Sequence, residues 1–133
     1  MPPLPRQPKP SDRTAIRDAW RAERRAADQA RLVGDANQEW AYLERAHILS
    51  QPMAGPHVRT HVSMLGYAVR HRDRHEVVGQ LIRLAVAGPG SLTGRYPVGN
   101  TGGANVSALR PMPIPDDLRG FLEGTPASEE VVA

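Results

Sequence analysis

Four side chains that can bind a metal ion flank one short turn of this sequence. Glu44 and His47 precede the turn, and His57 and His61 follow it, in the stretch YLERAHILSQPMAGPHVRTHVSML. Spacings of three and four residues place each pair on one face of a helix. Glu-x-x-His is half of the ligand pattern of carboxylate-bridged metal bundles, and His-x-x-x-His lets two imidazoles reach one ion. If the turn folds the second helix back beside the first, all four can surround one tetrahedral ion.

Two further features would complete or orient such a site. Met64 follows His61 on the same helical stripe, where its thioether suits a copper-like ion. The remaining imidazole nitrogens need hydrogen-bond acceptors, and we expect backbone carbonyls after Gly88 to supply them. Imidazole and carboxylate ligands without cysteine suit zinc, copper, nickel or iron, so the sequence does not identify the metal.

The alternative is a structural role for the same residues. Glu44 would then form an ion pair with Arg45 or Arg59, and His47 would be a hydrogen-bonded histidine of the core. His57 would be an exposed residue at the start of its helix.

Two other motifs carry less weight. His71 and His75 are four residues apart, but a helix break at Arg72-Asp73 separates them, and the basic residues around them would repel a cation. Residues 94–101 have the glycine spacing of a P-loop, but Asn100 stands in place of the lysine. We therefore expect Asn100 to bond the backbone of a turn rather than a nucleotide.

The composition describes a small chain without cysteine. Its 133 residues predict one domain at 11–123, between a proline-rich tail at 1–10 and a second tail at 124–133, both expected to be disordered. The lack of cysteine excludes disulfides, thiolate catalysis and zinc fingers. No apolar run approaches the roughly 20 residues of a membrane span, and no secretory signal opens the chain, so we expect a cytoplasmic protein.

Apolar spacing predicts an all-α fold with two antiparallel helix pairs. Ser11 is a candidate N-cap for a first helix that reaches about Val33, with alanines on its packing face and an arginine stripe opposite. Gly34-Asp35 ends that helix, and a second one covers 36–49. The alanines are Ala15, Ala19, Ala22, Ala26 and Ala30, and the arginine stripe is Arg17, Arg21, Arg24, Arg25 and Arg31.

The third helix is predicted from His57 to about Arg70, after a turn at 50–56, and the fourth from Asp73 to Ala87. In both helices the apolar line is expected to face the core. These lines are Val58, Val62, Leu65 and Val69 in the third helix, and Val77, Val78, Leu81, Leu84 and Ala85 in the fourth.

The stretch GDANQEWAYLERAHILSQP resembles the turn and second helix of a tetratricopeptide repeat, and a weaker copy begins at Asp73. The resemblance implies two stacked helix pairs, and because such arrays usually need about three repeats, something must cover the stack. Residues 88–115 are rich in glycine and proline and carry spaced apolar side chains. We expect them to form an ordered strap over the helices, followed by a short C-terminal helix at 118–122.

The blocks ERAHIL and GNTGGANVSALRPMPIP, together with the third-helix region, resemble a family of small bacterial proteins classified as a domain of unknown function. The resemblance covers residues 12–122. Members of that family tend to be encoded near metal-resistance or cation-efflux genes. The resemblance therefore implies a role in metal handling, and it assigns no residue a role.

These features predict a transition-metal-binding protein for sequestration, delivery or sensing, with Glu44, His47, His57 and His61 as ligands and Met64 as a fifth contact. The alternative is a non-catalytic interaction module that binds a protein, or less favourably a nucleic acid, through a concave surface or the arginine stripe. The alanines of the first helix would pack internally or form the seam of a homodimer. No nucleophile stands beside a base and no carboxylates are paired, so enzymatic activity is not predicted.

Overall fold

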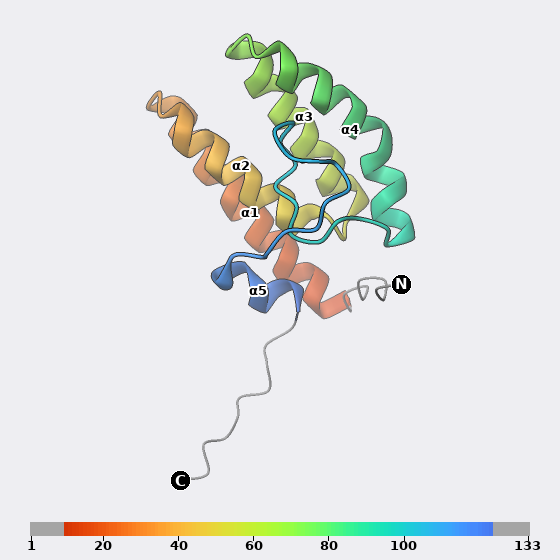
Figure 1. Cartoon of the computed structure of the whole chain (residues 1–133). Coiled ribbons are helices and arrows are strands. Elements are labelled where there is room, and N and C mark those ends of the chain that lie inside the picture. The colour runs from red at the N-terminus through yellow and green to blue at the C-terminus, as the bar shows by residue number, and fades with distance from the viewer. Residues whose placement is uncertain (1–9, 124–133) are drawn as a thin grey trace.

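The computed structural model describes residues 10–123, which form five helices and no strand (Figure 1). Two antiparallel pairs pack closely, which confirms the all-α prediction. The predicted tails fall outside the described residues, apart from the first residue of α1. The helices are α1 (Pro10–Leu32), α2 (Ala36–Ser50), α3 (Ala54–Arg70), α4 (Arg74–Thr93) and α5 (Asp116–Leu122).

The second helix of each pair begins with the same cap. Asp35 accepts a hydrogen bond from Gln38 N at 3.1 Å, and Asp73 accepts one from Glu76 N at 3.0 Å. Each aspartate thereby satisfies one of the four N–H groups that an α-helix leaves open at its start. The second helices of the two pairs therefore start in the same way.

α3 begins one turn earlier than predicted, at Ala54. Gly55 and Pro56 were expected to belong to the turn, and instead they form the first turn of the helix. Proline is tolerated there because the N–H it lacks would have no partner inside the helix. His57 consequently lies within the helix, with its N–H bonded to Met53 O at 2.9 Å.

α4 runs past its predicted end at Ala87 to Thr93 and contains Pro89. A proline inside a helix removes one backbone hydrogen bond, and here the helix continues because Ser91 is buried and bonded on its inner face. Gly94 ends the helix in the left-handed conformation, at φ 70°. The strap is therefore residues 94–115, which cross the helices in Figure 1.

The prediction that the apolar lines of α3 and α4 face the core is wrong. Val62, Val69, Val78 and Leu81 are each more than half exposed. Polar side chains fill the interior of this pair, because the strap and the neighbouring helices provide hydrogen-bond partners for them. The buried residues are Pro56, His57, Thr60, His61, Met64 and Ala68 in α3, and Glu76, Gly79, Gln80, Arg83, Ala87 and Ser91 in α4.

The main apolar core joins α1 and α2 to the end of the strap and to α5. On α1 the buried residues are Ile16, Trp20, Ala27 and Ala30. Of the predicted alanine series only Ala30 is buried, and Ala15 and Ala22 are exposed. The indole of Trp20 donates to Thr60 Oγ1 at 2.9 Å and so ties α1 to α3. The core cluster is Ile16, Trp20, Ala46, Ile48, Leu49, Met53, Ile114 and Leu118.

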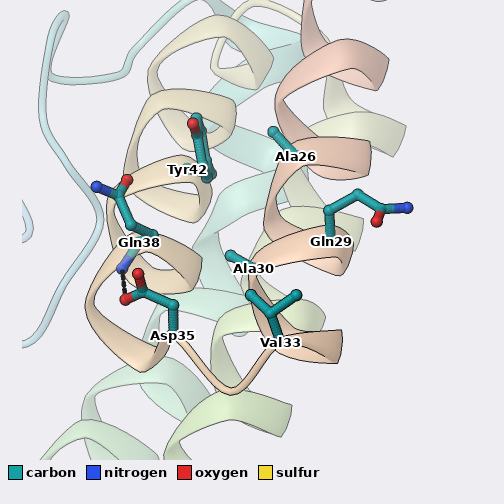
Figure 2. A pocket seen from close by; sticks show the side chains of 7 residues that line it. All are labelled: Ala26, Gln29, Ala30, Val33, Asp35, Gln38 and Tyr42. Carbon is teal, nitrogen blue, oxygen red and sulfur yellow. Dashed lines mark hydrogen bonds between the residues drawn. The ribbon is translucent and has the colours of Figure 1, made fainter.

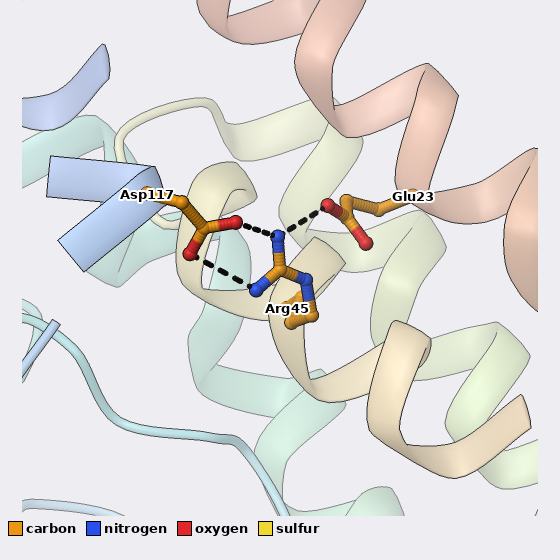
Figure 3. Close-up of polar contacts among 3 residues, drawn as sticks. All are labelled: Glu23, Arg45 and Asp117. Atoms are coloured by element: carbon orange, nitrogen blue, oxygen red, sulfur yellow. Dashed lines mark hydrogen bonds and ion pairs between the residues drawn. The ribbon is translucent and has the colours of Figure 1, made fainter. Parts of the chain in front are cut away.

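Ion pairs of one arginine with two carboxylates fix α5 against the first helix pair (Figure 3). The guanidinium of Arg45 donates to both carboxylate oxygens of Asp117 and to Glu23 Oε1, at 2.9 Å for the latter. The hydrogen bonds from Arg45 lower the pKa of the Asp117 carboxyl. Arg45 therefore pairs with two other helices and not with Glu44.

An open hollow of about 330 Å³ lies between α1 and α2 at the end where the two helices join (Figure 2). Its only charged lining residue, Asp35, caps α2. His47 lies 12 residues further along α2, roughly 18 Å away at 1.5 Å per residue. The hollow is therefore separate from the histidine site. Its lining is Ala26, Gln29, Ala30, Val33, Asp35, Gln38 and Tyr42.

Candidate metal centre

Three buried histidines converge where α2 turns into α3. His47 lies in the last turn of α2, and His57 and His61 occupy successive turns of α3. Their relative exposures are 3%, 6% and 2%. The Nε2 atom of His47 is 3.0 Å from that of His57 and 3.1 Å from that of His61, and the latter two are 3.2 Å apart.

The hydrogen-bond partners fix the tautomers of the first two rings. His47 Nδ1 lies 2.7 Å from Asn100 O, and a carbonyl oxygen can only accept, so His47 carries its proton on Nδ1. His57 Nδ1 lies 2.7 Å from Ser91 Oγ. The Ser91 hydroxyl donates its own hydrogen to Gln51 O at 2.5 Å, so it accepts from His57. Both Nε2 atoms therefore carry a lone pair.

A relay through Gln80 fixes the third ring. The Gln80 amide nitrogen donates to Glu76 Oε1 at 2.6 Å and to Gly102 O at 2.9 Å. Its Oε1 must then be the atom that accepts from His61 Nδ1, at 2.6 Å. All three histidines thus present an unprotonated Nε2 to one point, and their other nitrogens have the oriented acceptors typical of metal-binding histidines.

The environment keeps these imidazoles uncharged. Burial, followed by the charges of His61 and His57, lowers the pKa of His47 well below its ordinary value of 6.5. Burial lowers the pKa of His57 to about 3 and that of His61 to about 4. Neutral imidazole is the form that binds a metal, so the cluster is ready to coordinate at neutral pH.

The triangle has the size of a metal site. The three Nε2 atoms are close enough to one another to hold one ion, which would form bonds of roughly 2.0–2.1 Å with them. His47, His57 and His61 form a group of potential ligands whose donor atoms all lie within 4.8 Å of one another.

The other two predicted ligands, Glu44 and Met64, make different contacts. Glu44 is not in that group. Burial raises the pKa of its carboxyl, a hydrogen bond from the Thr101 side chain lowers it, and the charge of Glu76 raises it. Met64 is fully buried in an apolar cluster with Ala27 and Leu43. The ligand roles of Glu44 and Met64 stay predictions, and the geometry supports the three histidines.

The strap lies directly against the site. As expected, it supplies a backbone carbonyl to an imidazole, at Asn100, and the Asn100 side chain bonds the backbone of its own turn. Glu76 accepts from Ala104 N with both carboxylate oxygens, at 3.0 and 2.9 Å. Sequence reasoning missed Gln80, Ser91 and Glu76, although their positions among apolar residues of α4 were the available signal.

Gly102 allows the closest approach of the strap to the site. It has a φ of 85°, and a Cβ there would lie 2.6 Å from Cδ2 of His47. Gly102→Ala should therefore destabilise the fold and displace His47. Gly34→Ala is the matched control, because Gly34 has a φ of 76° with nothing within 4 Å of its Cβ position.

Both alanines carry the left-handed penalty of about 1–2 kcal/mol, and only Gly102→Ala adds overpacking of about 1–3 kcal/mol. Urea unfolding measures the stabilities, and metal titration should show lower affinity for Gly102→Ala alone. Equal stability and equal metal affinity in the two variants would contradict the close packing of the strap on His47.

The other charged motifs have partners within the fold. His71 stacks on Tyr67 with ring centroids 4.2 Å apart, and His75 Nε2 lies 3.2 Å from Ala104 O. Arg24 from the arginine stripe lies over the Trp20 ring and donates to Ser63 Oγ. These contacts connect elements of this chain.

Comparison with known proteins places the chain in a family without assigning it an activity. No curated protein and no solved structure matches it. No helix among residues 10–123 is both long and apolar enough to cross a membrane. The model of one family matches residues 14–122, which include every residue of the histidine site and of the hydrogen-bond network around it. The chain belongs to the family described as protein of unknown function (DUF3703).

Proposed function

We propose that this protein binds one transition-metal ion through Nε2 of His47, His57 and His61 and acts in metal handling without turnover. The observation that carries the proposal is the convergence of three unprotonated Nε2 atoms within 3.2 Å of one another. With each Nδ1 proton used elsewhere, no hydrogen is left to bridge these nitrogens, and their lone pairs repel. A cation between them replaces that repulsion with three coordinate bonds.

A purely structural histidine cluster explains the network less well. It would need at least one Nε2–H, which requires either a different tautomer or an imidazolium. Asn100 O, Ser91 Oγ and Gln80 Oε1 oppose the tautomer change, because each would lose its donor. Burial opposes the imidazolium.

Among the roles in metal handling, sequestration fits the burial of the site best. The three ligands are almost inaccessible to solvent, and the strap bonds directly to the residues that orient them. An ion held in this way exchanges only when the strap moves. Three imidazoles suit zinc, copper, nickel or iron, so the metal itself is decided by experiment.

Metal analysis of the untagged protein tests the proposal. After incubation with zinc, copper or nickel and removal of free metal, we expect about one equivalent per chain by elemental mass spectrometry. His47→Ala/His61→Ala should retain less than about a tenth of an equivalent, because one imidazole is left. His71→Ala/His75→Ala, which removes the same number of histidines outside the site, is the matched control and should bind normally.

Two results would overturn the proposal. One is wild-type protein that retains less than about a tenth of an equivalent of every metal tried, since a three-imidazole site should hold its ion through the removal step. The other is unchanged metal content in His47→Ala/His61→Ala.

A further inference from the structure

The outer surface of α3 and α4 is apolar although no part of the described chain covers it. Val78, Leu81, Ile82 and Val86 of α4 are 53–61% exposed. From Val77 to Thr93 the only charged residue is Arg83, which is buried. An α-helix at a protein surface normally exposes polar side chains, so an uncharged outer face over four turns marks a contact surface.

α3 continues the same surface. It packs beside α4, and its apolar line includes Val62 at 53% exposure and Val69 at 59% exposure. Val58, in that line, lies against Gly88 of α4, 3.7 Å from the position of a Cβ there. We define the outer face as Val62, Val69, Val78, Leu81, Ile82 and Val86.

We propose that a second copy of this chain covers the outer face and forms a two-fold symmetric dimer. The repeat architecture supports this occupant. Helix pairs of this type bury a continuous core by stacking, about three or more pairs are usual, and a terminal pair normally has a polar outer face. α5 and the strap end cover the first pair, whereas the second pair ends the stack with an open apolar side. Two copies joined there give four consecutive pairs with a cover at each end.

Surface area and charge support the same occupant. The six side chains of the outer face expose on the order of 600 Å² per copy, so a dimer would bury about 1,200 Å², within the range of specific interfaces. An isologous contact sets the same apolar residues against one another, and no charge on α4 is desolvated. The one charge in this part of α4, that of Arg83, is already buried within each copy.

The oligomeric state of the full chain tests the proposal. Light scattering at roughly 100 µM, well above the Kd of a stable dimer, should give twice the chain mass of 14.5 kDa. Ile82→Glu/Val86→Glu should weaken association at least about 100-fold, because it buries two carboxylates in the interface. Leu32→Glu/Leu109→Glu is the matched control, since these leucines are 79% and 84% exposed away from the outer face, and it should remain dimeric.

Circular dichroism and metal content separate this inference from the metal proposal. Ile82 and Val86 point away from the histidines, so Ile82→Glu/Val86→Glu should keep its helicity and its metal while it becomes monomeric. A wild-type monomer at that concentration, or a dimer that survives Ile82→Glu/Val86→Glu, would overturn the inference. So would flotation of wild-type protein, but not of this variant, with neutral phosphatidylcholine vesicles, which would assign the face to a lipid surface.

Discussion

Metal at a thousandfold excess over its Kd should raise the free energy of unfolding by about 4 kcal/mol, because the ion stabilises only the state that it binds. In the folded chain three Nε2 atoms converge within 3.2 Å. In the unfolded chain the nine residues between His47 and His57 no longer hold them together. Urea unfolding followed by circular dichroism, with and without metal, measures the increment.

The quantity to compare is the increment that metal adds to the free energy of unfolding of each variant, rather than the absolute stability of the variant. His47→Ala/His61→Ala removes two ligands and should lose nearly all of it. His71→Ala/His75→Ala keeps the three ligands and should retain it. Loss of the increment in His71→Ala/His75→Ala, or its persistence in His47→Ala/His61→Ala, would place the metal at another site.

Metal-free protein should lose stability steeply between about pH 6.5 and pH 4, because the unfolded chain then binds protons that the folded chain does not. The folded-state pKa of His57 is lowered to about 3, that of His61 to about 4, and that of His47 is well below 6.5. Near pH 5 all three are neutral when folded and protonated when unfolded. Each adds about 1.4 kcal/mol per pH unit, so together they give a slope of about 4 kcal/mol per unit.

The sign of this pH dependence follows from the direction of the histidine pKa shifts. A lowered histidine pKa leaves stability unchanged above the unfolded pKa and reduces it as pH falls toward the folded pKa. Glu44 acts in the opposite sense, because its pKa is raised by burial and its folded form takes up a proton first. Urea unfolding over a pH series measures the slope. A slope below about 2.8 kcal/mol per unit, the contribution of two groups, would mean that fewer than two of the histidines are buried neutral.

Local signals in the sequence identified most of the scaffold. The sequence predicted helix breaks at Gly34-Asp35 and Arg72-Asp73, and in the structure each aspartate caps the helix that follows through an N–H three residues away. The pairing of His57 with His61 followed from helical periodicity. The meeting of these two with His47 followed from the short turn between α2 and α3. None of these inferences depends on distant parts of the chain.

The ends of helices α3 and α4 could not be read from their prolines and glycines. Pro56 and Pro89 both lie within helices, whereas proline is usually a sign of a helix boundary. In α4 the helix continues because Ser91 is buried between His57 and Gln51, contacts that span 34 and 40 residues. The tertiary hydrogen bonds of Ser91 therefore outweigh the tendency of Pro89 to end the helix.

The prediction of which sides of α3 and α4 face the core differs most from the structure. Tertiary contacts explain this difference too. Periodicity finds an apolar line but cannot say whether that line meets the core or another molecule. The interior of this pair is polar because Gln80, Glu76 and the strap bond one another around the histidines. A buried polar group is tolerated only when each of its atoms finds a partner, and those partners are distant in sequence.

Helix periodicity and capping act over three or four residues, so the sequence alone was enough to place the three histidines on two neighbouring helices. The tertiary structure adds that His47, His57 and His61 converge and that their Nε2 lone pairs face one another. The tautomers depend on Asn100, Ser91 and Gln80, which lie 19 to 53 residues from the rings that they orient. Hydrogen bonds over such separations exist only once the chain has folded.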